Sequence, residues 1–180
     1  MKTRNRYNLT ILLLLLFFLI PALVWAVDKA KGKPEVEENF LSYITERGED
    51  FLSYITEVKP YKEWDLWPGT EKMYEGTEPH GVLLTTYVNK QALKGIEQGM
   101  LEQGMPDGSI IVKENYSADK ELINVTSMYK RKGYNPEAGD WFWIVHTPDK
   151  EVDNAGKIGM CISCHSQMEH RDYLFIGPHR

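Results

Sequence analysis

Hydrophobic residues concentrate in four stretches of the chain that polar turns separate, and this pattern predicts β-strands. The stretches are "GVLLTTYVN" (81–89), "SIIVKENY" (109–116), "ELINVTSMY" (121–129) and "WFWIVHT" (141–147). Each is rich in the β-branched and aromatic residues that strands favour. The turn sequence "MPDG" precedes the second stretch and "YNPEAGD" precedes the last. Because the strands follow one another through short links, we expect an antiparallel sheet.

A helical period predicts one amphipathic helix near the N-terminal end of this region, over residues 35–57. The segment contains a repeat, "FLSYITERGED FLSYITEVKP". Eleven residues are close to three helical turns, so Phe40 and Phe51 share a face, as do Ile44 and Ile55. We interpret this helix as one that covers the core of the domain.

Two local signals refine the predicted helices. Gly48 is expected to weaken the first helix, because glycine is less favourable than alanine by ~1 kcal/mol in a helix interior. Asn89 is expected to cap a short helix, "KQALKGIEQ" (90–98). With helices at both ends of the run of strands, the predicted fold class is α+β, with a mostly antiparallel sheet.

The start of the chain has the pattern of a secretory signal peptide over residues 1–26. A basic start, "MKTRNR", is followed by the uncharged run "LTILLLLLFFLIPALVWA", and Val24 and Ala26 offer the small residues of a cleavage site. An uncleaved membrane anchor is the alternative, since the run approaches the ~20 residues that span a bilayer. Either interpretation places the remainder outside the cytoplasm, and we expect a periplasmic protein. Residues 27–38 form a polar leader, and 39–180 form the folded domain.

Charge and cysteine content narrow the function classes. The net charge is −5, and the predicted signal peptide carries basic but no acidic residues, so the remainder is more acidic than the whole chain. An acidic domain without a basic cluster is a poor nucleic-acid binder. The only two cysteines lie in one short motif, which is not a disulfide framework. The chemistry of this chain is therefore expected at that motif.

The motif is "CISCH", with Cys161, Cys164 and His165. A thioredoxin-like dithiol opens a helix in a βαβ unit, and no such unit is predicted here. A structural zinc site normally has four ligands, and a second matched pair is missing. C-x-x-C-H is also the signature for covalent haem, in which two thiols at the start of a helix bond the vinyl groups and the histidine binds iron. We favour one covalent haem c, carried by a C-terminal helix.

The ligand opposite the proximal histidine, at the sixth coordination position of the iron, determines what a haem protein does. Fifteen residues follow His165, and Met168 is expected on the same helix and the same side of the haem. A sixth ligand would therefore come from upstream. The upstream candidates are His80, His146, Met100, Met105 and Met128. Each is more typical as a core methionine or a surface histidine, so we expect an open, five-coordinate iron.

Several motifs, in order, resemble the cytochrome P-460 family. They are "YKEWDLWPG", "EPHGVLLTTYVN", "MPDGSIIVKENY", "SMYKRKGYNPEAGDWFWI" and "CISCH…DYLF", and together they cover roughly residues 38–175. The resemblance implies a mostly antiparallel sheet that packs one haem, often in a homodimer. It implies a five-coordinate haem with a proximal histidine, which His165 matches.

The resemblance also implies two alternative chemistries. The name-giving members oxidise hydroxylamine and have a lysine bonded to the haem ring, and Lys113 matches that lysine. A sister group, the cytochromes c′-β, lacks the bond, carries apolar residues over the iron and binds nitric oxide. Leu84 stands where the oxidisers have an arginine, and Thr126 where they have a glutamate, which weakens a proton relay. Glu114 should point away from Lys113, because side chains alternate along a strand.

We therefore expect an exported mono-haem cytochrome that binds or oxidises a small nitrogen compound, with enzymatic activity left open. The distal candidates are Leu84, His80, Met128 and Thr126. The expected partners are that small molecule, a periplasmic redox partner and a second copy of the chain. The alternative is a protein with the same haem that transfers electrons or binds a gas without catalysis.

Overall fold

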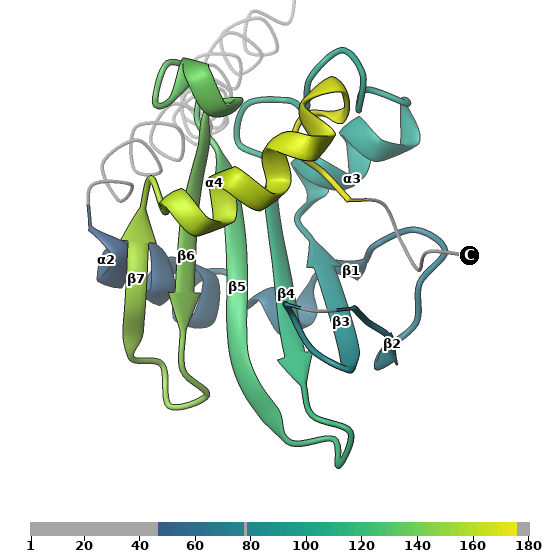
Figure 1. Ribbon diagram of the computed structural model, residues 1–180, viewed down its shortest axis with the longest axis vertical. Helices are drawn as coiled ribbons and strands as arrows, with labels where there is room; N and C mark the ends of the chain where they lie inside the picture. The colour runs from purple at the N-terminus through teal and green to yellow at the C-terminus, as the bar shows by residue number, and fades with distance from the viewer. Residues whose placement is uncertain (1–46, 78, 176–180) are drawn as a thin grey trace, which may run out of the picture. The chain divides into compact units, whose positions relative to one another are not determined.

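A seven-stranded antiparallel sheet organises the part of the chain that the computed structural model describes, residues 47–77 and 79–175. The strand order is β1-β3-β4-β5-β6-β7, and β2 also pairs with β3 (Figure 1). The strands are β1 (Asp65–Leu66), β2 (Tyr74–Glu75), β3 (Leu83–Val88), β4 (Ile110–Tyr116), β5 (Leu122–Lys130), β6 (Trp141–His146) and β7 (Val152–Gly156). Every pairing is antiparallel, as the short links predict.

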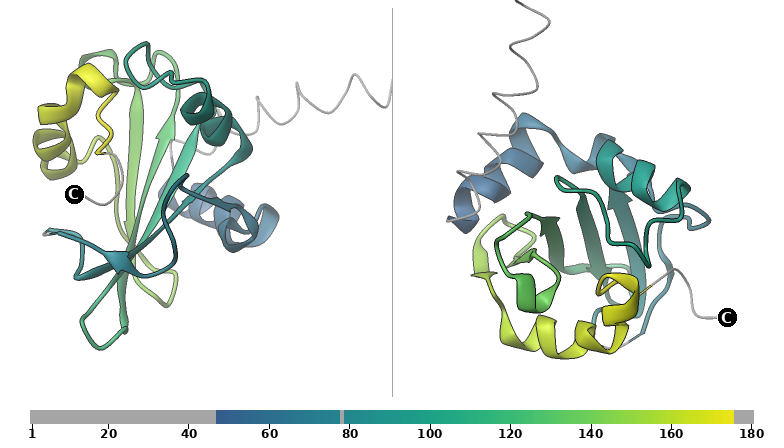
Figure 2. Two further views of the ribbon diagram at one scale, coloured as in Figure 1. Left: turned by 90° about the vertical axis from the view of Figure 1, so that its right-hand side faces the viewer. Right: turned by 90° about the horizontal axis from the view of Figure 1, so that it is seen from above.

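Helices cover both faces of this sheet. Helix α4 (Gly159–His165) crosses one face, and α2 (Gly48–Ser53) lies against the other, as the edge-on view shows (Figure 2). Helix α3 (Lys90–Glu97) connects β3 to β4. Short 3-10 segments span Tyr61–Glu63, Pro136–Ala138 and Ser166–Arg171. No helix within residues 47–77 and 79–175 has the length and apolar character needed to cross a membrane. The predicted α+β class is confirmed.

The four predicted strands are present with bounds close to those expected, but three further strands were not predicted. β1 and β2 are only two residues long, too short for a sequence pattern to reveal. β7 has the sequence VDNAG and is largely polar. It forms at the sheet edge through backbone pairing with β6, which needs no hydrophobic pattern.

The predicted helix over 35–57 is only partly within the described residues. Phe40 and Ile44 lie outside them, whereas Phe51 and Ile55 are both fully buried, as expected of one face. The α-helix ends at Ser53 and continues as a π-helical turn, Tyr54–Val58. The expectation that Gly48 merely weakens the helix was incomplete. A Cβ at Gly48 would lie 2.6 Å from the Ala155 Cβ, so this glycine permits close packing of α2 on β7.

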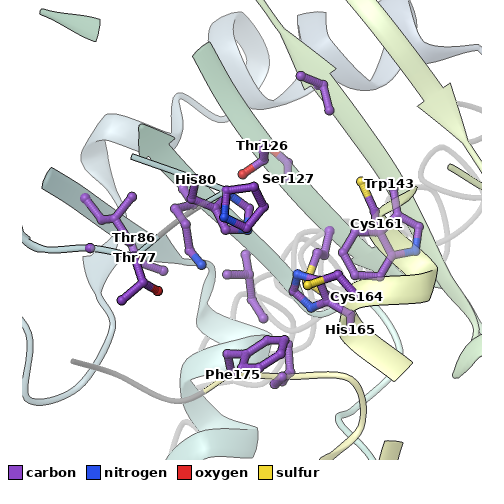
Figure 3. A pocket seen from close by; sticks show the side chains of 18 of the residues that line it. Thr77, His80, Thr86, Thr126, Ser127, Trp143, Cys161, Cys164, His165 and Phe175 are labelled. Carbon is purple, nitrogen blue, oxygen red and sulfur yellow. The ribbon is translucent and has the colours of Figure 1, made fainter. Parts of the chain in front are cut away.

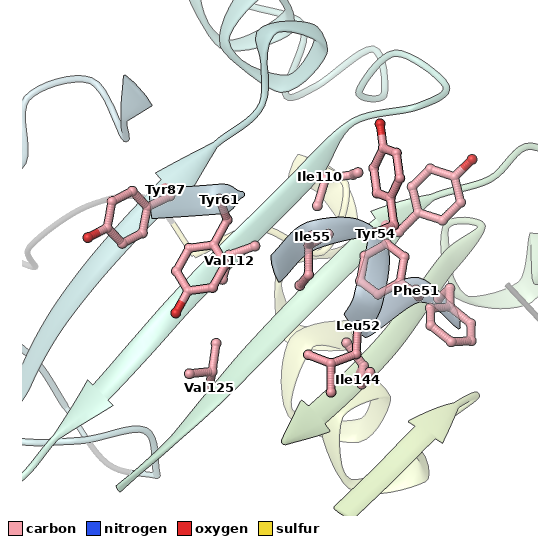
Figure 4. Close-up of a cluster of buried hydrophobic side chains, with 12 residues drawn as sticks. Phe51, Leu52, Tyr54, Ile55, Tyr61, Tyr87, Ile110, Val112, Val125 and Ile144 are labelled. Atoms are coloured by element: carbon pink, nitrogen blue, oxygen red, sulfur yellow. The ribbon is translucent and has the colours of Figure 1, made fainter. Parts of the chain in front are cut away.

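Strand alternation divides the hydrophobic side chains into two clusters. The cluster on the α2 face is a closed core (Figure 4). Its buried members are Phe51, Leu52, Tyr54, Ile55, Tyr61, Tyr87, Ile110, Val112, Val125, Tyr129, Phe142 and Ile144. The cluster on the α4 face includes Val88, Ile111, Met128, Trp141 and Trp143. The sheet thus has one face fully covered by the core and one face that carries the cavity described below.

The predicted cap of α3 is confirmed and ties that helix to the sheet. The Asn89 side-chain oxygen accepts hydrogen bonds from Ala92 N at 2.9 Å and from Ile110 N at 3.0 Å. Its amide nitrogen donates to Gly108 O at 2.8 Å. One side chain therefore fixes the start of α3 and the turn that leads into β4, the strand of Lys113.

Candidate haem site

A cavity of about 630 Å³ lies between the sheet and α4 (Figure 3). This volume is within the ~300–1,000 Å³ typical of cofactor and ligand sites. Its lining comes mainly from strands β2 to β6, from α4, from the loop before β3 and from the segment after Arg171. Among the lining residues are Leu84, Lys113, Thr126, Met128, Trp143, His80, Cys161, Cys164, His165, Leu174 and Phe175.

The sheet wall of the cavity follows from strand register. Lys113 is paired with Thr86 on β3 and with Thr126 on β5, so these three residues form one row across the sheet. Because residues two apart share a face, Ile111 lies on the same side as Lys113. Glu114 lies on the other side, as expected, where its carboxylate accepts hydrogen bonds from the Tyr61 hydroxyl at 2.8 Å and the Tyr116 hydroxyl at 2.7 Å.

The helix wall of the cavity carries the cysteine motif. Cys161 and Cys164 are three residues apart on α4, a spacing that places two side chains on one helical face. Both thiols are free and half-buried, and burial raises the pKa of the Cys161 thiol. His165 is the last residue of α4 and is buried. The helix therefore presents two thiols and an imidazole to the same cavity (Figure 3).

The His165 ring is held in one orientation. Its Nδ1 lies 2.6 Å from the Tyr173 carbonyl oxygen, and since a carbonyl only accepts, Nδ1 carries the proton and Nε2 has the free lone pair. The ring packs edge-on against Trp143 at 4.7 Å and against Phe175 at 5.1 Å between centroids. Burial lowers the pKa of His165 to about 4, so the imidazole is neutral at pH 7 and able to bind a metal.

Two basic side chains in the cavity also have lowered pKa values. Burial lowers the pKa of Lys113 from 10.5 to about 8, although the nearby Cys164 opposes this shift. Burial, and then the charges of Lys113 and His165, lower the pKa of His80 to about 3. Low solvation disfavours the charged form of each group. The cavity therefore favours an uncharged imidazole at His80 and a readily deprotonated amine at Lys113.

The model of the family described as Cytochrome P460 matches residues 58–176, which is well over half of the chain. The chain belongs to the cytochrome P460 family. No match was found among curated proteins. Membership supports a haem c cytochrome, in agreement with the sequence motif.

The residues of the cavity fit the haem of a cytochrome P460 protein. Two thiols at C-x-x-C spacing and a neutral imidazole with a free Nε2 are the donor set that attaches and ligates haem c. The interpretation of the cysteine motif as a zinc site lacks a comparable set of ligands among the described residues. Within residues 47–77 and 79–175, no three His, Cys, Asp or Glu side chains form a cluster able to hold a metal ion.

The cysteine motif, Lys113 and the four distal candidates all line this one cavity. The four candidates are Leu84, Thr126, Met128 and His80. Of the other upstream ligand candidates, His146 is buried and its Nδ1 bonds the Thr147 carbonyl, and Met100 and Met105 do not line the cavity. Met168 is in the 3-10 segment after α4, and not on the same α-helix as was expected, because the backbone bends there.

Sequence reasoning did not single out three residues of this cytochrome P460 site: Trp143, Tyr173 and Phe175. Each contacts the His165 ring or its Nδ1. The Trp143 indole N–H is also buried without a hydrogen-bond partner in the described part of the chain. A buried donor of this kind suits a site that receives a group with acceptor atoms, such as the carboxylates of haem. The motifs "GDWFWI" and "DYLF" contained all three residues, but their contacts are tertiary.

Proposed function

We propose that this protein is an exported mono-haem c-type cytochrome that binds nitric oxide, or a similarly small nitrogen compound, at an open iron position. The observation that supports it best is the composition of the cavity. Its helix wall offers the two thiols and His165, while its sheet wall offers mainly apolar and hydroxyl side chains, such as Leu84, Thr126 and Met128. Apart from the Met128 thioether and the Lys113 amine, the side chains that β3 to β6 contribute to this wall carry no group that commonly binds iron.

Each residue has a definite task in this proposal. The sulfurs of Cys161 and Cys164 would hold the haem through its vinyl groups. His165 Nε2 would bind the iron while its Nδ1–H remains on the Tyr173 carbonyl. The haem would supply an iron to which a small molecule can bind. Leu84 and Met128 keep bulk water out, because both side chains are buried and apolar.

Oxidation of hydroxylamine is the second candidate function. It releases protons, so the site must provide acceptors. Among the described lining residues the carboxylate is Glu75, which is exposed, and Leu84 and Thr126 carry no titratable group. His80, with a pKa lowered to about 3, is a weak proton acceptor, and Lys113, with a pKa lowered to about 8, still carries its proton for the most part at pH 7. The shortage of proton acceptors makes oxidation the second candidate, and the mainly apolar and hydroxyl side chains of the sheet wall favour ligand binding.

Optical spectra of the ferrous holoprotein test the binding proposal. We expect a high-spin spectrum that changes fully on addition of nitric oxide or carbon monoxide. His80→Leu should leave the spin state unchanged, as should His170→Leu, an exposed control. A low-spin wild-type spectrum that becomes high-spin only in His80→Leu would contradict the proposal. His80 would then be a sixth ligand, and an electron carrier would be favoured.

Peptide mapping separates binding from oxidation. We expect a digest to yield the haem on the segment around Cys161 alone, with Lys113 in a separate peptide. Lys113→Ala should then leave the spectrum of an ordinary c-type haem unchanged, as should Lys120→Ala, an exposed control. A haem peptide that joins the Lys113 and Cys161 segments would instead favour the hydroxylamine-oxidising branch.

A further inference from the structure

A buried ion pair lies directly behind the residue that orients His165. The Asp172 carboxylate accepts from Lys130 Nζ at 2.5 Å through Oδ1 and from Met105 N at 2.6 Å through Oδ2. The side chains of Lys130 and Asp172 are 13% and 6% exposed. Buried charges are retained only when they are well paired, so this contact is a specific one. It joins β5 to the segment after α4, which are far apart in sequence.

The backbone at this point has an unusual conformation. Asp172 and Tyr173 both have positive φ, 53° and 64°, although neither is glycine. Two successive left-handed residues reverse the chain after the 3-10 segment, and Tyr173 N donates back to Met168 O. Such backbone persists only where the surroundings hold it in place. The reversed turn is what brings the Tyr173 carbonyl to His165 Nδ1.

Two further contacts hold the same turn, and both involve neighbours of Lys130. Trp141 Nε1 donates to the Asp172 carbonyl at 2.9 Å. Lys130 Nζ also donates to Gly139 O at 2.6 Å, and a Cβ at Gly139 would lie 2.7 Å from the Tyr173 ring. Lys130 therefore connects Asp172 with the loop on which the Tyr173 ring packs. Both the carboxylate and the ring of this turn are fixed from the sheet side.

We propose that Lys130 and Asp172 are positioning residues for the axial ligand. They hold the Tyr173 carbonyl against His165 Nδ1 and so fix the orientation and basicity of the imidazole that binds iron. A hydrogen bond from the second ring nitrogen raises the basicity of a ligating histidine, and loss of such partners typically costs ~10–100-fold in metal affinity or activity. The inference rests on the haem role proposed for His165, but not on the identity of the nitrogen compound.

Asp172→Asn and Lys130→Met test the proposal in the holoprotein. Asparagine tolerates positive φ, so Asp172→Asn removes the charge and keeps the turn. Lys130→Met leaves Asp172 and its bond from Met105 N in place. We expect both variants to lower the iron–histidine stretching frequency of the ferrous protein, measured by resonance Raman spectroscopy, and to raise its reduction potential. A weaker hydrogen bond makes the imidazole a poorer donor to ferric iron, which explains both shifts.

Glu114→Gln is the matched control. Glu114 is equally buried, at 2% exposure, and is also hydrogen-bonded, but it lies on the other face of the sheet. The Glu114→Gln variant should have a lower melting temperature but an unchanged iron–histidine stretching frequency and reduction potential. If Asp172→Asn or Lys130→Met lowers the melting temperature but keeps the wild-type frequency and potential, the ion pair only stabilises the fold and the inference is wrong. A wild-type protein without covalent haem would instead overturn the proposed function itself.

Discussion

At the scale of single residues, two neighbours on β4 show how the sheet creates different environments. Lys113 and Glu114 are adjacent in sequence but face opposite sides. Glu114 is enclosed by tyrosine hydroxyls and the Lys62 ammonium at 3.5 Å, so its charge is compensated. Lys113 faces the cavity, where burial lowers the pKa of its amine. The paired carboxylate belongs to the core, and the less compensated amine belongs to the site.

The lowered pKa of Lys113 makes stability depend on pH. Between pH 8 and 10.5 the unfolded chain keeps this proton while the folded protein loses it, so the free energy of unfolding should rise with pH across that window. Below pH 8 the full cost of burying the ammonium remains, up to about 3 kcal/mol for a shift of this size. Lys113→Met should therefore be more stable than wild type at pH 7, with the advantage lost by pH 10.5.

Urea unfolding of wild type and Lys113→Met at pH 7, 9 and 10 measures this effect. In Lys120→Met, at an exposed position, the free energy of unfolding should change with pH as it does in wild type. If the free energy of unfolding changes with pH equally in wild type and Lys113→Met, the prediction is wrong. The exception is a Lys113 that peptide mapping finds bonded to haem, because such a lysine cannot titrate.

At the scale of elements, the first and last described α-helices both begin with glycine but for different reasons. Gly48 opens α2 and faces Ala155 and Val152 of the edge strand β7. Gly159 opens α4, and a Cβ there would meet nothing within 4 Å. The glycine of α2 is required by packing, whereas that of α4 is not. Close contact with α2 is also one way in which the largely polar β7 is held in place.

This contrast predicts opposite effects of two alanine substitutions. Gly48→Ala should cost ~1–3 kcal/mol of unfolding free energy, because the added methyl group overpacks the contact with Ala155. Gly159→Ala should be neutral or stabilising by up to ~1 kcal/mol, since it lowers the entropy of the unfolded chain without a clash. Chemical denaturation of both variants measures the difference. Similar gains in both variants would mean that helix propensity, which favours alanine over glycine, and not packing, decides the effect.

At the scale of the whole molecule, the sheet has a closely packed hydrophobic core on one face and the cavity for the cofactor on the other. The α2 face is filled by aromatic and aliphatic side chains. On the opposite face, α4 is only seven residues long. Isolated helices shorter than ~12–15 residues are marginal in water, so α4 depends on what packs beneath it. Bound haem should therefore stabilise this face more than the core.

Intact-mass measurement of the denatured protein tests attachment and export together. We expect a chain that begins near Val27 and carries one haem. Cys161→Ala with Cys164→Ala should remove the haem from the denatured chain. In that double variant we expect faster hydrogen exchange in α4 than in wild type, with little change in α2. A mature chain that begins at Met1, or one with no added mass, would overturn the corresponding part of the proposal.

Sequence alone determined the features that depend on short-range spacing. Strand alternation predicted that Lys113 and Glu114 face opposite sides of the sheet. The Asn89 cap could be predicted because its partner is three residues away. The C-x-x-C-H motif indicated haem c, because its three donors lie within five residues of one helix. The resemblance indicated Leu84 and Thr126 as neighbours of the haem, and the structure places both at the cavity.

Only the tertiary structure decided the contacts that bridge distant segments. The pair of Lys130 and Asp172 joins residues 42 apart, and the carbonyl of Tyr173 reaches His165 only through a turn of two left-handed residues. Strand β7 forms by pairing with β6, which its polar sequence does not reveal. Hydrophobic periodicity reports which face of an element is buried, but it does not report which partner lies there. Partner choice depends on register and packing across the whole sheet, which no local pattern encodes.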